Sequence, residues 1–482
     1  MNIVAVIFWG LVALGDLCFL QHILRDGNTD PDARMIWALL VLLLPVVGWG
    51  LYLLVGQGYR KPREFDRLHA ATRARFEKEL DPSLFPADGE ELVDGDFRPL
   101  ARLLRGCGEG NRVFGGNAFE IITSGLRKRE LILEDIRNAR QFIHIEYFRF
   151  GNDKAGREVR DLLFQKVAEG VEVRFLNNNM IGRDIPRSYF REMQEAGMEV
   201  LPYTHIRNGF HQWLMRFNAQ NHRKVVIIDG RIAYTGGMNL NDNYFYRWRD
   251  THLRITGPVI SRLEASFLDS WFSTGGTLGH PLPWYFPADI PQEEAPYQNK
   301  TLQVVTDAVE HPWPTTQLGY EWILNNAKRY VYLQTPYFVP PVSVLNALKG
   351  AALRGVDVRL MLPLKMDTPF VGPANQSCYE ECLEAGVRLF IRGGAFIHSK
   401  TLVADDYVTI VGASNLDMRS FHTNSEVNTF IYDRETALAS KEIFLSDKEN
   451  VEELSLEAWR SRKHTWFQDV VAGFLRICYR LL

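Results

Sequence analysis

The feature that most constrains this chain is one short pattern that occurs twice. His222-Arg-Lys224-Val-Val-Ile-Ile-Asp229 and His398-Ser-Lys400-Thr-Leu-Val-Ala-Asp405 both read H-x-K-x-x-x-x-D. A single match in a chain of this length arises by chance often enough to be weak evidence. The two histidines lie 176 positions apart (398 − 222), and the same offset relates Gly236 to Gly412, Asn239 to Asn415, and Asp250 to Glu426. This shared spacing predicts two copies of one half-site on two similar domains.

Each copy is predicted to form a β-hairpin. Residues two apart on an extended strand point to the same side, so the histidine and the lysine of each copy project together. The aspartate that ends each copy is followed by Gly230 or Asp406, which gives a turn signal, and the next residues are typical of a returning strand. Glycines after that strand allow close approach, so Asn239 and Asn415 are predicted to donate amide hydrogens to a bound substrate.

Two histidines, two lysines and two asparagines in one pocket suit a phosphodiester. Lysine ammonium groups neutralise its non-bridging oxygens, and asparagine amides donate to them as charge grows in the transition state. One histidine can attack phosphorus and form a phosphohistidine, while the other protonates the leaving alkoxide and then deprotonates the incoming alcohol. The sequence has no cluster with metal-ligand spacing. We therefore expect neither a metal nor another cofactor, and the lysines take the electrostatic role of a metal.

Two pairs of carboxylates accompany the histidines. Asp250 and Glu426 each follow a histidine by 28 positions (250 − 222 and 426 − 398), and each is predicted to hydrogen-bond the far ring nitrogen of that histidine. A structural ion pair is the alternative. Asp229 and Asp405 belong to the repeated pattern and are counted with the catalytic set, although a turn residue is an equally good interpretation.

Helix and strand patterns alternate from about residue 111 onward. Periodic apolar residues predict helices over 128–141 and 341–353, and β-branched or aromatic runs predict strands over 142–150, 171–176, 330–334 and 356–362. The alternation predicts an α/β fold with helices on both faces of a sheet. A proline-rich, acidic stretch over 279–296 is typical of a linker between two domains, which are predicted to span 111–278 and 297–482.

Two apolar stretches, 3–20 and 35–55, are each long enough to cross a membrane as a helix. A signal peptide is a weaker interpretation of the first, because no basic residue precedes it and a second span follows. Two buried helices of a soluble core are a further alternative. The predicted transmembrane hairpin, 1–56, is followed by a basic juxtamembrane linker, 57–110. The basic residues at the start of this linker, over 60–78, predict that the attached domains are cytoplasmic.

Composition narrows the class of protein further. A net charge of −3 argues against a nucleic-acid partner. The five cysteines are scattered, which argues against zinc or a disulfide framework and favours a reducing compartment. The C-terminal end of the second domain has the spacing of an amphipathic helix, docked on the domain or on the membrane. Aromatic residues over 210–217 predict either a loop that enters the lipid interface or core packing.

The motifs and their flanks resemble the two signatures of the phospholipase D superfamily. The first signature corresponds to residues 221–229 with 235–239, and the second to residues 396–405 with 412–420. Within the superfamily the chain resembles the bacterial cardiolipin synthases. That resemblance rests on Thr335-Pro-Tyr-Phe-Val-Pro340, Trp248-Arg-Asp250-Thr-His252, Asn424-Ser-Glu426 and the apolar hairpin that ends at Gly56. It covers nearly the whole chain.

The resemblance implies two phospholipase D-like domains, each a mixed sheet flanked by helices, packed as a pseudo-twofold pair. It implies metal-independent phosphatidyl transfer between two phosphatidylglycerol molecules, which yields cardiolipin and glycerol through a phosphohistidine. His222 would be the nucleophile and His398 the general acid, or the reverse. The implied partners are phosphatidylglycerol and other anionic lipids of the bacterial inner membrane, which the chain would span twice with cytoplasmic catalytic domains.

Three other functions stay open at this point. The nearest is another transphosphatidylase or a phospholipase D-type lipid hydrolase, with the same intermediate and a different acceptor. A membrane-tethered nuclease would need a basic, aromatic-lined groove, which the net charge disfavours. A non-catalytic lipid-binding scaffold is disfavoured because both half-sites keep all their chemical groups.

Overall fold

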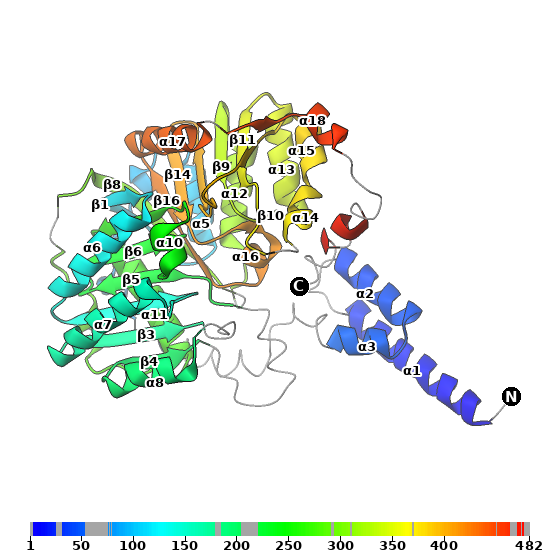
Figure 1. Cartoon of the computed structure of the whole chain (residues 1–482), viewed down its shortest axis with the longest axis horizontal. Helices are drawn as coiled ribbons and strands as arrows, with labels where there is room; N and C mark the ends of the chain where they lie inside the picture. The colour runs from blue at the N-terminus through cyan, green and yellow to red at the C-terminus, as the bar shows by residue number, and fades with distance from the viewer. Residues whose placement is uncertain are drawn as a thin grey trace.

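One mixed sheet of 15 strands forms the centre of the protein (Figure 1). The computed structural model describes residues 3–25, 31–53, 76, 78, 80–178, 185–203, 220–290, 294–308, 311–368, 371–449, 451–462, 470–473 and 475–476. Its strands are β1 (Val113–Ile122), β2 (Phe142–Tyr147), β3 (Glu172–Asn177), β4 (Glu199–Pro202), β5 (Lys224–Ile228), β6 (Ile232–Gly236), β7 (His252–Thr256), β8 (Tyr297–Asp307), β9 (Tyr330–Gln334), β10 (Phe338–Val339), β11 (Asp357–Pro363), β12 (Arg388–Arg392), β13 (Thr401–Ala404), β14 (Val408–Gly412), β15 (Leu416–Asp417), β16 (Glu426–Tyr432) and β17 (Glu453–Leu454). β10 and β15 form a small separate sheet.

The strand order repeats when the large sheet is followed outward from its middle. One half runs β1-β7-β6-β5-β2-β3-β4, and the other runs β8-β16-β14-β13-β9-β11-β12, with β17 added at the edge. In both halves the hairpin strands are antiparallel and the next three strands are parallel. β1 and β8 are antiparallel neighbours, with Val113 opposite Gln303. The two expected sheets are therefore joined edge to edge into one.

Helices cover both faces of this sheet, as the alternating pattern predicts. They are α5 (Arg98–Gly106), α6 (Gly125–Asn138), α7 (Lys154–Ala168), α8 (Arg187–Glu195), α10 (Asp242–Tyr246), α11 (Ile260–Ser273), α12 (Thr315–Asn326), α13 (Val342–Leu353), α14 (Val371–Gln376), α15 (Tyr379–Glu384), α16 (Met418–His422), α17 (Arg434–Lys448) and α18 (Leu456–Ser461). Alternate residues of β5 enter two different cores. Val226 and Ile228 pack with α6, α7 and α8, whereas Val225 and Ile227 pack with α11. Burial on both faces explains why this strand reads as a continuous apolar run, and the α/β prediction is confirmed.

The second half of the sheet is covered in the same way. Leu402 of β13 packs with α12, α13 and α15, whereas its neighbour Val403 packs with α17 through Phe444. Figure 1 shows α17 on one side of β14 and β16, and α12 and α13 beside β9 and β11. Each half-sheet thus carries a helical layer on one face and one long helix, α11 or α17, on the other.

The segment predicted as a juxtamembrane linker, 57–110, ends in a core helix. Leu100 and Leu104 of α5 are fully buried in the same core as α12, because four-residue spacing places them on one face of the helix. Residues 80–97 add two short 3₁₀ helices, η2 (Pro82–Leu84) and η3 (Glu90–Leu92). The part of this segment after residue 80 therefore belongs to the folded domain. The predicted linker 279–296 likewise contains η5 (Leu282–Tyr285), whose Tyr285 is fully buried.

In the described part of residues 1–56 there are three helices: α1 (Ile3–Arg25), α2 (Pro31–Leu43) and α3 (Val47–Leu51). Among the described helices, only α1 combines the length and the hydropathy that a membrane span needs. α2 has 13 residues, which is short for a crossing, so the predicted two-span hairpin stays a prediction. Trp49 Nε1 donates to Asp16 Oδ1 at 2.7 Å and ties α3 to α1. The basic flank 60–75 lies outside the described residues.

Only parts of the predicted C-terminal amphipathic helix are described. Residues 470–473 and 475–476 are helical. Arg476 forms an ion pair with Glu381 of α15 at 2.8 Å and donates to the Ser377 carbonyl oxygen at 3.2 Å. These contacts attach the segment to the second half of the sheet.

Candidate active site

The two motifs begin at equivalent places in the two halves of the sheet. His222 lies two residues before the start of β5, and His398 lies three residues before the start of β13. In each motif the lysine folds back toward its histidine. Lys224 Nζ donates to the His222 carbonyl oxygen at 2.5 Å, and Lys400 Nζ donates to the His398 carbonyl oxygen at 2.6 Å. The histidine and lysine of each copy therefore lie on one side, as predicted.

The motif aspartates lie at the opposite ends of these strands. Asp229 and Asp405 occupy the hairpin turns with positive φ values of 53° and 52°. The Asp229 carboxylate accepts from three successive backbone amides, those of residues 140–142, at 2.7–2.9 Å. The Asp405 carboxylate accepts from the amides of residues 328–330 at 2.7–3.0 Å. These two residues hold the turns against the start of β2 and β9, which supports the turn interpretation, and the catalytic assignment of both aspartates stays a prediction.

The two halves meet at two short parallel bridges beside the histidines. Asn221 pairs with Ser425, and Arg249 pairs with Ile397. The His222 amide donates to the Ser425 carbonyl oxygen at 2.8 Å. In the same way the His398 amide donates to the Arg249 carbonyl oxygen at 2.7 Å. Each histidine is therefore anchored through its backbone to the other half of the molecule.

These bridges decide which carboxylate reaches which imidazole. Glu426 follows Ser425, and its carboxylate oxygens both lie 3.0 Å from His222 Nδ1. Asp250 follows Arg249, and its Oδ2 lies 2.7 Å from His398 Nδ1. Both carboxylates are fully buried. The sequence pattern predicted that each carboxylate serves the histidine of its own half, and that pairing is wrong, because each one contacts the histidine of the other half.

Burial governs the protonation of the site. It lowers the pKa of both imidazoles well below its ordinary value, and the charges of Lys224 and Lys400 lower it further. Burial raises the pKa of Glu426 to about 7 and that of Asp250 to about 6, against the opposing charges of the two lysines. It lowers the pKa of Lys400 to about 8. These shifts favour neutral imidazoles at pH 7, the state that a nucleophile needs.

The two predicted substrate-binding asparagines are buried and differ in their contacts. The Asn239 side-chain oxygen accepts from the Arg149 backbone amide at 3.1 Å. The backbone amide of Asn415 donates to Ser420 Oγ at 3.0 Å. Within the described part of the chain, the Asn415 side-chain oxygen has no hydrogen-bond partner.

Aromatic rings surround His398 more fully than His222. The nearest rings to His398 have centroids 5.2, 5.4, 6.0 and 6.4 Å away and belong to Tyr244, Trp248, Phe396 and Tyr337. The Tyr244 hydroxyl lies 3.4 Å from His398 Nε2. Phe148 is the ring in contact with His222, at 4.7 Å, in the described part of the chain. The sequence motif treats the two histidines alike, whereas their surroundings differ.

Two arginines that sequence reasoning did not single out tie the first half to the second. Arg223 donates to the Glu426 carbonyl oxygen at 3.3 Å. Arg249 pairs with Asp447 at 2.6 Å and donates to Ser399 Oγ at 3.1 Å. Their positions in the sequence could have identified them, because one arginine lies between the motif histidine and lysine and the other directly precedes Asp250. The aromatic segment 210–217, predicted to admit lipid, lies outside the described residues.

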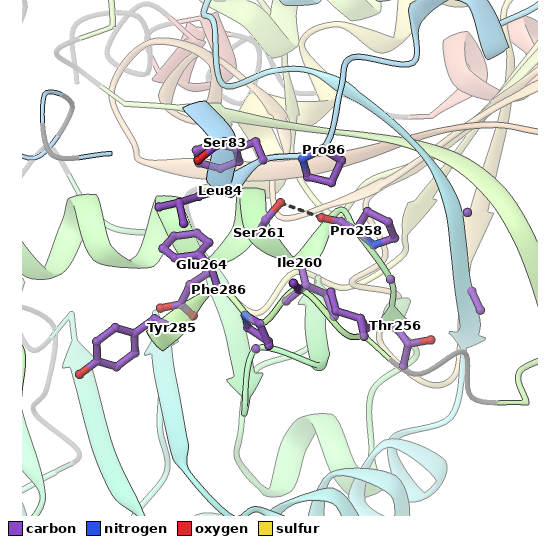
Figure 2. Close-up of a pocket in the computed structure, with 18 residues that line it drawn as sticks. Ser83, Leu84, Pro86, Thr256, Pro258, Ile260, Ser261, Glu264, Tyr285 and Phe286 are labelled. Atoms are coloured by element: carbon purple, nitrogen blue, oxygen red, sulfur yellow. Dashed lines mark hydrogen bonds between the residues drawn. The ribbon is translucent and has the colours of Figure 1, made fainter. Parts of the chain in front are cut away.

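A cavity of about 510 Å³ lies at the turn end of the first motif (Figure 2). Gly230, directly after the motif aspartate, lines it together with Glu264 and Tyr285. Ser261 and Pro258 form another part of its wall, where the serine hydroxyl donates to the proline carbonyl oxygen at 2.7 Å. None of the motif histidines or lysines lines this cavity, so it is separate from the paired-histidine site.

The paired half-sites on one doubled sheet define the phospholipase D class of fold and site. A family model described as cardiolipin synthase, PLD-like domain, matches residues 132–271 and 321–448. A second, described as phospholipase D-nuclease N-terminal, matches residues 3–57. The chain belongs to the cardiolipin synthase family of the phospholipase D superfamily.

Similar proteins extend over most of the chain. A cardiolipin synthase of Halalkalibacterium halodurans is 31% identical over 98% of this chain and 92% of its own length. The major cardiolipin synthase ClsA of Bacillus subtilis is 36% identical over 84% of each chain. The crystal structure of a phosphatidylserine synthase from Haemophilus influenzae superposes with a TM-score of 0.58 at 15% identity. That superposition covers 78% of this chain and 96% of the other, and it supports the fold alone.

Proposed function

We propose that the protein is a cardiolipin synthase that transfers a phosphatidyl group from one phosphatidylglycerol to another and releases glycerol. The observation that carries this proposal is the cross-paired site, in which two buried imidazoles each receive a carboxylate from the opposite half. The family relationship over nearly the full chain supplies the substrate class.

In the first step, His222 Nε2 attacks the phosphorus of the donor lipid. The bond from phosphorus to the glycerol oxygen breaks, and His398 gives its proton to that oxygen. Lys224 and Lys400 hold the non-bridging oxygens, and the charge of the bound phosphodiester favours the protonated form of His398. Glu426 accepts from Nδ1 of His222, which leaves Nε2 unprotonated for the attack.

In the second step, a hydroxyl of the acceptor phosphatidylglycerol attacks the same phosphorus. His398 takes the proton of that hydroxyl, the phosphorus–nitrogen bond breaks, and the neutral His222 returns. Asp250 accepts from Nδ1 of His398 and stabilises the positive charge that His398 carries before the first step and regains in the second. The net reaction exchanges one phosphate ester for another and consumes no water.

We also propose the arrangement in the membrane. Two phospholipase D-like domains, a pseudo-twofold pair, follow a two-span hairpin within residues 1–56, and both domains lie on the cytoplasmic side of the bacterial inner membrane. The apolar helix α1 and the match of residues 3–57 support an anchor. Anionic lipids beside the basic segment 57–78 would supply the substrate.

The test is incubation of the detergent-purified protein with phosphatidylglycerol alone, with the products separated by mass. Cardiolipin and glycerol in equal amounts are expected, and a chelator should leave the rate unchanged because the lysines carry the electrostatic role. Phosphatidic acid as the main product would mean hydrolysis and would contradict the proposal.

A further inference from the structure

An exposed arginine lies at the rim of the paired-histidine site. Arg149 is the second residue after β2, and its guanidinium lies 5.6 Å from the ring centroid of Phe148. That ring in turn lies 4.7 Å from His222. The backbone fixes the position, because the Arg149 amide donates to Asn239 and its carbonyl oxygen accepts from Leu240.

The charge of Arg149 reaches both sides of the site. Besides burial and the motif lysines, Arg149 lowers the pKa of His222 and of His398. It also acts on Tyr244, which contacts His398. In the described part of the chain, the Arg149 guanidinium pairs with no carboxylate. The charge of this exposed guanidinium therefore acts on both imidazoles.

The equivalent rim position in the second half has no cation. Asp229 N donates to the Phe142 carbonyl oxygen, and Asp405 N donates to that of Tyr330, so these two strand starts correspond. Seven residues after each start lie Arg149 and Tyr337. The Tyr337 hydroxyl donates to Asp367 at 2.7 Å. At this pair of positions, the first half carries a cation and the second half carries a phenol beside a carboxylate, although Arg419 of the second half also lowers the pKa of His222.

The proposed reaction requires a second anion in the site. The two buried lysines bind the reacting phosphate. The acceptor phosphatidylglycerol carries a second phosphate, at the other end of the glycerol whose hydroxyl attacks. Three carbons separate the two phosphates in the product, so their charges repel each other unless a further cation is present. A guanidinium suits this role because it donates two parallel hydrogen bonds to a phosphate.

We infer that Arg149 binds the phosphate of the acceptor lipid and thereby selects an anionic glycerol-bearing acceptor over a neutral alcohol. This inference rests on the proposed function, because it assigns the second substrate of that reaction. It makes Arg149 a specificity-determining residue outside the repeated motif.

The test compares two acceptors that attack with the same kind of hydroxyl. Cardiolipin formation from phosphatidylglycerol uses the anionic acceptor. Incorporation of labelled glycerol into phosphatidylglycerol uses a neutral one, through the same phosphohistidine and the same proton transfer to His398. Both reactions are measured in mixed detergent micelles for the unaltered protein, Arg149→Ala and Arg149→Lys. Arg191→Ala is the control, since it removes an exposed arginine from α8 at the outer edge of the sheet.

For Arg149→Ala, we expect cardiolipin formation to fall about tenfold or more, as for loss of a charged hydrogen-bonded pair. Glycerol incorporation should stay within about twofold, which also shows that the variant is folded. Arg149→Lys should lie between these values, and Arg191→Ala should change neither reaction.

Two results would overturn the inference. An equal fall of both reactions in Arg149→Ala would mean that Arg149 serves the donor phosphate or the fold. No change in either reaction would mean that it contacts no phosphate. If the unaltered protein formed neither cardiolipin nor labelled phosphatidylglycerol, the proposed function would be wrong. The assignment of Arg149 to the acceptor lipid would then be wrong as well.

Discussion

Glu426 and Asp250 decide which nitrogen of each imidazole faces the substrate. Each carboxylate contacts Nδ1, at 3.0 Å for His222 and 2.7 Å for His398, so Nε2 is left for the reaction. Each carboxylate belongs to the half of the chain opposite its histidine. Neither half therefore contains a complete histidine–carboxylate pair, and we expect neither half to be active alone.

The rate of cardiolipin formation should depend on pH through buried groups of the site. The carboxylate of Glu426, with a pKa raised to about 7, is ionised above that pH and loses its charge below it. Lys400, with a pKa lowered to about 8, loses its positive charge above that pH. We therefore expect maximal kcat between about pH 7 and about pH 8. A rate that stays constant from pH 5 to pH 9, with chemistry limiting, would contradict this assignment.

Substitution of Glu426 tests the acid side of that profile. Glu426→Gln keeps the shape of the side chain and removes the titrating charge. We expect kcat to fall roughly 100-fold, within the range for general acid–base groups, and the decline below pH 7 to disappear. Asp250→Asn is the matched variant, and it should retain the decline near pH 7 that Glu426 causes. If Glu426→Gln lowered kcat but left the pH profile of kcat unchanged, Glu426 would have only a structural role.

The hairpin turn after β5 is held in place by the carboxylate of one residue. Asp229 adopts a φ of 53° and binds three amides at the start of β2. Asparagine tolerates this backbone conformation and keeps one acceptor oxygen, whereas alanine provides neither. We expect Asp229→Ala to lower the free energy of unfolding by about 1–3 kcal/mol and Asp229→Asn by less.

Thermal unfolding of the detergent-solubilised variants measures this difference. Transfer by the folded fraction of Asp229→Ala should remain close to that of the unaltered protein, because the turn lies at the far end of β5 from His222. An Asp229→Ala protein that unfolds normally but has lost its activity would instead support the catalytic assignment of this aspartate.

The sequence pattern predicted the elements better than their connections. Periodicity located β9 and α13 nearly to the residue, because their apolar faces are continuous. The exchange of carboxylates between halves depends on two single-residue bridges, such as that between Asn221 and Ser425. Contacts between residues so far apart in the chain leave no local pattern, so the constant offset suggested the wrong pairing. The sequence repeat also did not predict that aromatic rings surround His398 more fully than His222, or that Arg149 is present in one half only. A repeat identifies the residues that its two copies share, and these features differ between the copies.

At the scale of the whole molecule, one continuous sheet explains how two half-sites become one. Edge pairing of β1 with β8 places the halves in a fixed relation. Arg249, which pairs with Asp447 across the halves, reinforces that relation next to His398. The duplication predicted two similar domains but not this junction, because edge pairing of two strands can join domains in several registers.

The proposed two-span hairpin predicts where two sites lie relative to the membrane. In a variant without native cysteines, Asn28→Cys lies between the spans, and Glu91→Cys lies in the folded domain. We expect a membrane-impermeant thiol reagent to label Asn28→Cys in intact cells and Glu91→Cys only after the membrane is opened. Equal protection of both positions in intact cells would instead support a single crossing by α1.

In the proposed mechanism, both histidines act on one phosphorus atom. The most direct measurement uses a phosphatidyl lipid with p-nitrophenol as its leaving group, which departs without a proton from His398. His398→Ala should then accumulate a phosphatidyl adduct on the peptide that contains His222, because the second step lacks its base. His222→Ala should form no adduct. If each single variant instead retained about half of the p-nitrophenol burst, the histidines would serve independent sites and the central claim would be contradicted.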